Sequence, residues 1–128
     1  MRDYVTMRAV LATAANAGRE LCYSDFHADG RDDKLREELV RLTDDGLLDA
    51  DVAFDVGFGE VGRCNVKGLT AEGREFYNLV ENDGVWELIH ETLQKASIDV
   101  SYPLLKEVCE EIVKRYVTSF IPEMPTRR

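Results

Sequence analysis

The first seventeen residues carry apolar side chains at helical spacing. Gly18 follows the last of them, and glycine is common just past the end of a helix. The apolar positions are Tyr4, Met7, Val10, Leu11 and Ala14. The pattern predicts an amphipathic helix over 3–17.

The next stretch is shorter and less regular. Residues 21–26 partly alternate between apolar and polar side chains, and a polar stretch over 27–30 follows. Alternation with a period of two is typical of a strand, and the polar stretch is too short for a helix. We expect a short strand followed by a turn.

A leucine face marks a second long helix, which begins after Arg31 and Asp32 and ends at Gly46. Leu35, Leu39 and Leu42 lie on one side of a wheel drawn at about 100° per residue, so this side is expected to face the core. The opposite side carries Asp33, Glu37, Val40, Arg41 and Asp44. The predicted helix is thus amphipathic, with a leucine side opposite a mostly charged side.

Two alternating segments follow, over 47–56 and 61–69, and they predict a two-stranded hairpin. The turn between them, 57–60, begins a G-x-G-x-x-G string that runs from Gly57 to Gly62. In a dinucleotide-binding site such glycines open a helix, whose amino end holds the pyrophosphate. Because a strand follows this string, we interpret it as a glycine-rich turn.

The carboxy-terminal half is helical. Thr70 is a good cap for a helix that carries Phe76, Tyr77 and Val80 and that 82–84 terminates. A further helix is expected over 85–95, with Trp86, Ile89 and Leu93 on one side. Ser101 caps a last, long helix with Pro103 in its first turn, and Pro122 and Pro125 follow it.

The last helix has an unusually wide apolar stripe. Its members are Leu104, Leu105, Val108, Cys109, Ile112, Val113, Tyr116, Val117 and Phe120. Such a stripe is wider than one neighbouring helix covers in a small domain. Two explanations stay open: a homodimer through Val108, Ile112, Tyr116 and Phe120, or complete cover by the 3–17 and 85–95 helices of the same chain.

The order helix, short strand, helix, hairpin and helix resembles a winged helix, with the hairpin as the wing. The Gly46-Leu47-Leu48 entry into the hairpin and the Leu69-Thr70-x-x-Gly73 start of the next helix are common in that family. The predicted fold class is therefore α+β, a winged helix-turn-helix with additional helices. We expect one domain over 1–128, with the core and wing in 1–69 and a helical extension in 70–121.

More narrowly, residues 1 to about 117 resemble a small prophage-associated winged-helix family of unknown function. The matching stretches are Met1-Arg2-Asp3-Tyr4, Gly46-Leu47-Leu48, 69–76, and Asp83-Gly84-Val85-Trp86 followed by a long helix. The resemblance implies a phage or mobile-element setting and supplies no catalytic residues. The chain departs from helix-turn-helix proteins that read DNA because it has almost no second helix.

Composition limits the classes of function. With 16 Lys and Arg against 25 Asp and Glu in 128 residues, the net charge is −9, which opposes general binding to nucleic acid or anionic lipid. No apolar run approaches the roughly 20 residues that cross a bilayer, and no signal peptide is evident. Three widely spaced cysteines suggest reduced thiols, so we expect a cytoplasmic protein with no membrane partner.

The charge is concentrated in two segments. Residues 32–50 hold seven acids and three bases, and 70–101 hold seven acids and two bases. An acidic surface can imitate the phosphates of nucleic acid and bind a basic groove on a protein, although the same charge also simply keeps a protein soluble. The predicted partner-binding residues are Asp32, Asp33, Glu37, Glu38, Asp44 and Asp45.

Catalysis has little support in the sequence. His27 and His90 are the two histidines, and Cys22, His27 and Cys64 have no recognised metal spacing. His90 lies one turn after Trp86 and is expected to pack against it. Cys109 is expected to be a buried apolar residue. We expect no enzyme activity, no metal and no cofactor.

The favoured function is therefore non-enzymatic. It is that of a phage-type accessory protein that binds a host or phage protein, such as an anti-CRISPR-like inhibitor of a nucleic-acid-handling complex. No residue distinguishes this accessory function from an assembly role in a phage-derived element. The alternative is a dimeric transcription regulator that contacts DNA through Arg36, Arg41, Arg63 and Lys67.

Overall fold

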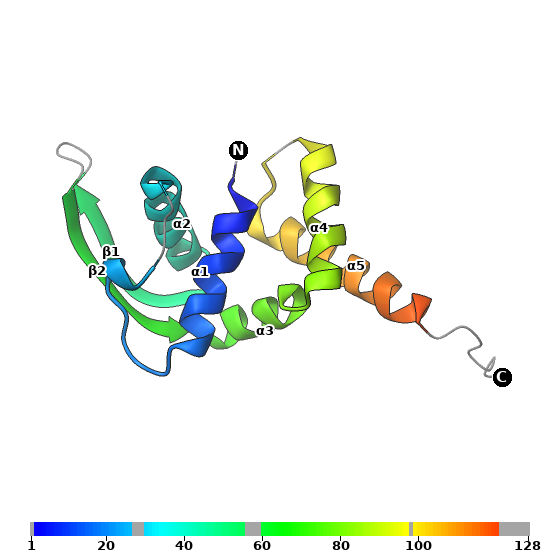
Figure 1. The fold of residues 1–128 in the computed structure, drawn as a ribbon, viewed down its shortest axis with the longest axis horizontal. Helices are drawn as coiled ribbons and strands as arrows, with labels where there is room; N and C mark the ends of the chain where they lie inside the picture. The colour runs from blue at the N-terminus through cyan, green and yellow to red at the C-terminus, as the bar shows by residue number, and fades with distance from the viewer. Residues whose placement is uncertain (1, 27–29, 56–59, 98, 121–128) are drawn as a thin grey trace. The chain divides into compact units, whose positions relative to one another are not determined.

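The computed structural model describes residues 2–26, 30–55, 60–97 and 99–120. The chain divides into two compact units, residues 1–78 and 79–128. The first holds the helices α1 (Tyr4–Asn16), η1 (Tyr23–Asp25), α2 (Asp32–Asp44) and most of α3 (Ala71–Val80), and the strands β1 (Leu48–Asp55) and β2 (Glu60–Leu69) (Figure 1). The second holds α4 (Asp83–Ala96) and α5 (Tyr102–Ser119). The class is α+β, with a two-stranded antiparallel sheet in the described part of the chain.

The prediction of α1 is confirmed. All five of its predicted apolar residues are buried, and they form part of the core of the first unit. The Asp3 carboxylate caps the helix by accepting a hydrogen bond from the Thr6 backbone N–H at 3.0 Å. Arg31, which precedes α2, also pairs with Asp3, at 3.2 Å.

The short strand predicted over 21–26 is wrong except at its first residue. Leu21 forms an isolated antiparallel bridge with Val66 of β2, and the chain then enters the single 3₁₀ turn η1. The Asp25 side chain is the physical reason, because it accepts a hydrogen bond from the Cys22 backbone N–H at 2.8 Å and so favours a turn. Arg19 pairs with the same carboxylate at 3.0 Å and lowers its pKa far below the usual range.

The hairpin matches the prediction. Leu48 pairs with Leu69 at one end and Asp55 with Glu60 at the other, and the register shifts twice between these ends. Along β2, Arg63 and Lys67 are exposed whereas Val66 is buried, so the strand alternates as expected. The predicted turn residues 57–59 lie outside the described part of the chain. The last glycine of the string, Gly62, lies within β2 and does not open a helix.

A compact junction joins the end of the hairpin to α3. Thr70 donates its N–H to the Leu47 carbonyl at 3.0 Å and its hydroxyl to the Gly46 carbonyl at 2.6 Å, and it accepts from the Gly73 N–H at 2.9 Å. A Cβ on Gly73 would collide with the Leu47 carbonyl oxygen. The Leu-Thr-x-x-Gly sequence therefore has a local structural cause: the threonine ties two chain segments together, and the glycine lets them approach.

The second unit is an α4–α5 pair. Asp83 and Gly84 begin α4 instead of ending α3, because the Asn82 side chain caps α4 by accepting from the Val85 N–H at 3.1 Å. Ser101 precedes α5 as predicted, but its side chain makes no capping hydrogen bond. His90 stacks on Trp86 with 5.5 Å between ring centroids, and Cys109 is buried, both as predicted. In the described part of the chain, no helix combines the length and apolar character needed to cross a membrane.

Candidate protein-binding surfaces

The inner side of α2 is fixed by leucines and by a buried ion pair. Leu35, Leu39 and Leu42 are almost completely inaccessible to solvent. Beside them, the Arg2 guanidinium donates through Nε to both carboxylate oxygens of Glu38, at 3.0 and 3.1 Å. Both residues are buried, with 4% and 2% of their surface exposed. This pair joins the segment before α1 to the middle of α2.

The burial of Glu38 corrects one predicted binding residue. On the helical wheel Glu38 lies next to the leucine stripe, so α2 turns it inward, and Arg2 supplies the opposite charge that makes its burial tolerable. Asp45 is half-buried and is also reached by Arg2, at 3.5 Å. The predicted acidic surface therefore loses Glu38, and Asp45 contributes little to it.

Burial also shifts the ionisation of Glu38. Removal from water raises the pKa of its carboxyl to about 7, and the neighbouring Arg2 and Arg41 charges only partly oppose this. Burial of the charged Glu38 carboxylate therefore costs free energy even though Arg2 is its partner. It is a feature of the fold of the first unit, and it is not available to a ligand.

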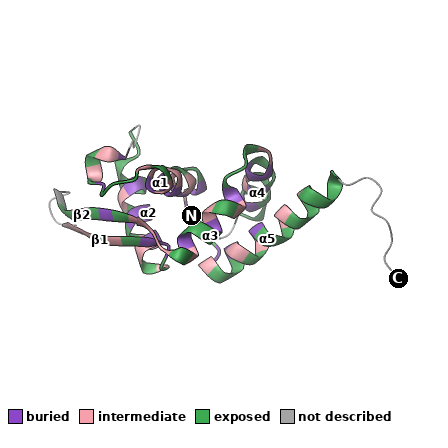
Figure 2. Ribbon diagram, turned by 90° about the horizontal axis from the view of Figure 1, so that it is seen from below, coloured by how far each residue is buried: buried purple, intermediate pink, exposed green. Residues whose placement is uncertain are grey.

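The outer side of α2 is acidic. Asp33, Glu37, Val40 and Asp44 are exposed, as the helical wheel predicts, and we call these four residues the acidic face. Figure 2 colours the ribbon by burial, with buried stretches purple and exposed stretches green. Asp32, at the start of the helix, is exposed too and accepts a hydrogen bond from the Tyr23 hydroxyl at 2.7 Å. The face combines three carboxylates with one exposed apolar side chain.

The residues predicted for DNA binding do not form an uncompensated basic patch. Arg36 donates to Asp33 at 2.7 Å, and its side chain is only 26% exposed. Arg63 pairs with Asp51 of the neighbouring strand at 3.1 Å. Arg41 is half-buried, and Lys67 is exposed on β2. Two of the four bases thus already have a carboxylate within ion-pair distance, and a phosphate would have to compete with it.

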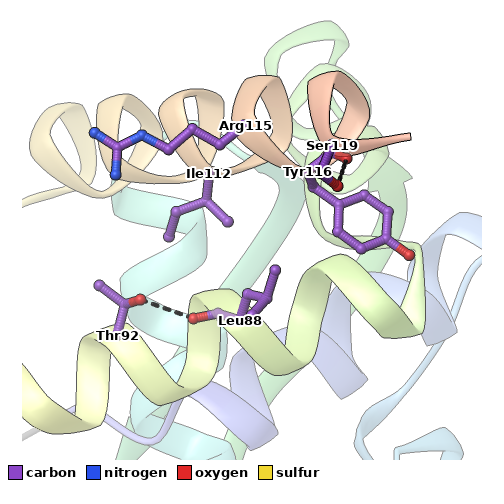
Figure 3. A pocket seen from close by; sticks show the side chains of 6 residues that line it. All are labelled: Leu88, Thr92, Ile112, Arg115, Tyr116 and Ser119. Atoms are coloured by element: carbon purple, nitrogen blue, oxygen red, sulfur yellow. Dashed lines mark hydrogen bonds between the residues drawn. The ribbon is translucent and has the colours of Figure 1, made fainter. Parts of the chain in front are cut away.

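A second surface feature lies between α4 and α5. It is an open groove of about 270 Å³, drawn in Figure 3, and we call it the α4/α5 groove. Its lining residues are Leu88 and Thr92 from α4, and Ile112, Arg115, Tyr116 and Ser119 from α5. The Tyr116 hydroxyl lies against Gly84 of α4, where an added Cβ would be 2.5 Å from its oxygen. Of the four residues predicted to form a dimer, Ile112 and Tyr116 line the groove.

The remaining two lie beside that pair on α5. Val108 is half-buried one turn before Ile112. Phe120 is 67% exposed just after the helix, with its ring edge-on to Tyr116 at a centroid distance of 4.8 Å. The predicted apolar stripe is thus real, but of the stripe only Leu105 and Cys109 are fully buried.

The three cysteines differ in their exposure to solvent. Burial raises the pKa of Cys64 to about 11 and that of Cys109 to about 12, so both thiols stay protonated at neutral pH. Cys22 is exposed, and His27 lies outside the described residues. Within the described ranges, no three His, Cys, Asp or Glu side chains group closely enough to hold a metal ion.

Comparisons of the chain with protein-family models, with curated proteins and with solved structures find no match.

Proposed function

We propose that this chain acts without catalysis, by binding another protein through the acidic face of α2. One observation carries the proposal: α2 presents three exposed carboxylates around the exposed Val40, and Arg36 of the same helix already pairs with Asp33 at 2.7 Å. The matching partner is a basic protein surface with a small apolar depression. Such surfaces occur where proteins bind nucleic acid, so the acidic face would compete with it there.

The anchoring of α2 supports this role. The leucines and the Arg2–Glu38 ion pair hold the helix by its inner side, so the acidic face does not have to be ordered when a partner binds. A surface that is already ordered loses less conformational entropy on association. Charge at its edge accelerates encounter with an oppositely charged partner, and Val40 gives a point of apolar contact.

The arrangement of the first unit is compatible with a winged helix, in which the β1–β2 hairpin is the wing and α2 the helix before it. In the described residues, the place of the second helix of a helix-turn-helix is taken by the single turn η1. We therefore propose a winged-helix-like scaffold adapted to protein binding. The resemblance of 1–117 to a prophage-associated family supports an accessory role in a phage or mobile element, with inhibition of a host nucleic-acid-handling complex as its specific form.

A transcription regulator has less support. Docking α2 into a groove of DNA would place Asp33, Glu37 and Asp44 near phosphates, and each such pair repels. The remaining bases, Arg63 and Lys67, are too few for strong phosphate binding.

The decisive experiment compares two double charge reversals that change the net charge equally. Glu37→Lys with Asp44→Lys alters the acidic face, whereas Glu107→Lys with Glu110→Lys alters exposed positions of α5. In quantitative affinity purification from the source cell, we expect at least one protein to be lost about tenfold with the first variant and retained with the second. Equal retention by both variants contradicts the proposal.

A gel-shift experiment tests the alternative function, that of a DNA-binding transcription regulator. At about 50 mM salt, where phosphate contacts are strongest, we expect no sequence-dependent complex with genomic DNA fragments. A complex that Arg63→Ala with Lys67→Ala abolishes would favour DNA binding instead.

A further inference from the structure

The second unit carries apolar surface that its own two helices do not cover. Leu88 and Leu104 are each 44% exposed, and Ile112 lies half-buried in the α4/α5 groove. Along α5, Leu104, Val108 and Ile112 follow one another at intervals of four residues and therefore form a continuous ridge. Ridges of this spacing are the features that pack into the grooves of another helix.

The charges that border this ridge are balanced. Arg115 is the charged residue that lines the groove, and Glu111 pairs with it at 3.4 Å from one turn earlier on the same helix. On α4, Glu91 and Lys95 form a similar pair at 2.9 Å. A chain with a net charge of −9 repels a second copy of itself in general, so self-association needs a neutral surface such as this one.

The order of these charges is also self-complementary. In a two-fold symmetric pair, the same patch of each copy contacts the other copy. If two α5 helices pack antiparallel with their midpoint near Val113, Glu111 of each copy lies opposite Arg115 of the other. Ile112, one residue from the midpoint, then lies close to Ile112 of the other copy. Such charge pairing favours a second copy over a partner that is uniformly basic or acidic.

We infer that the α4/α5 groove is occupied by the same groove of a second copy of this chain, in a two-fold dimer whose four helices form an antiparallel bundle. The dimer interface belongs to the second unit and the acidic face of α2 to the first, so the two share no residue. Dimerisation and partner binding can consequently fail independently in experiment.

Sedimentation velocity of the full chain between about 5 and 500 µM tests the inference. We expect a concentration-dependent rise to about twice the monomer mass of 14.5 kDa. Leu88→Glu should weaken the dimer by at least about 100-fold, because the two-fold axis buries the new carboxylate twice. Val117→Glu is the matched control, since Val117 is 52% exposed about 140° around α5 from Ile112.

Charge reversal gives a second, independent set of variants at exposed positions, for which unfolding is not expected. Arg115→Glu should dissociate the dimer by placing like charges opposite each other, and adding Glu111→Arg should restore it by swapping the pair. Lys114→Glu, which makes the same charge change on the polar side of α5, should leave the dimer intact.

Circular dichroism confirms that each variant is folded. A chain that stays monomeric at 500 µM overturns the inference. So does a dimer that survives both Leu88→Glu and Arg115→Glu, or one that Val117→Glu dissociates while Leu88→Glu does not.

Discussion

α2 and α5 are both amphipathic helices, yet they use their apolar side chains in different ways. In the 13 residues of α2, all three leucines are buried, and the outer side is left to carboxylates and Val40. In the 18 residues of α5, only Leu105 and Cys109 are buried, and apolar residues such as Leu104 and Val117 reach solvent. α2 therefore buries its leucines in the core, whereas α5 leaves much of its apolar surface exposed and available for association.

A wide apolar stripe and a narrow one have different structural consequences. A narrow stripe indicates a helix that one core covers completely, as with α2. A wide stripe indicates more surface than a small fold can bury, as with α5. Substitutions in the two helices should accordingly differ in whether they change folding stability or association.

The largest contrast is expected for leucine truncation. Leu39→Ala in α2 should lower the free energy of unfolding by about 3 to 5 kcal/mol, since it leaves a cavity at a fully buried site. Leu104→Ala in α5 should cost less than about 1 kcal/mol. Urea denaturation, at concentrations where the chain is monomeric, measures the free energy of unfolding of both variants. Equal losses of stability would contradict the proposed distinction between the helices.

The next largest effect concerns the ion pair that orients α2. Arg2→Ala should cost about 3 kcal/mol at pH 8, because it leaves the buried Glu38 carboxylate without its positive partner. Arg74→Ala, at an exposed position of α3, is the control and should stay within about 0.5 kcal/mol. A loss below about 1 kcal/mol in the first variant would show that the Arg2–Glu38 contact does not hold α2 in place.

The same pair should make stability depend on pH. The pKa of Glu38 is raised to about 7 in the folded chain, above its ordinary value of 4.5, so the folded state binds the proton more tightly than the unfolded state does. This contribution to stability is fully present below about pH 4.5 and is lost as the pH rises through about 7. Glu38→Gln should remove that part of the pH dependence between pH 4.5 and 8, as measured by urea titrations at several pH values. An unchanged slope would assign the dependence to other groups.

The helices and the hairpin could be predicted from sequence because each depends on local periodicity. The Leu35, Leu39 and Leu42 spacing indicated both the buried side and the exposed side of α2. The strand expected over 21–26 was wrong because the Asp25 side chain, not the alternation, decides the backbone there. Asp83 and Gly84 were assigned to a helix end because capping by Asn82 and termination by Asn-Asp-Gly look alike in sequence.

The Arg2–Glu38 pair could not be found in this way, because its members are 36 residues apart and no periodicity links them. One local signal existed: on the wheel of α2, Glu38 lies beside the leucines, where a carboxylate needs a partner. The sequence also identified the surplus of apolar residues on α5. It could not tell which side of the stripe stays exposed, since that depends on how α4 packs against it.

The smallest effects are expected on the outer surfaces of both helices, and they test what those surfaces are for. Glu37→Lys on α2 and Val117→Ser on α5 should each change the free energy of unfolding by no more than about 0.5 kcal/mol in urea, because neither side chain is packed in the core. A core residue cannot be replaced so freely. If Glu37→Lys leaves stability unchanged but removes partner capture, the carboxylate serves binding alone. If it destabilises the chain by more than about 1 kcal/mol, Glu37 supports the fold, and this result contradicts the proposal that the acidic face serves binding alone.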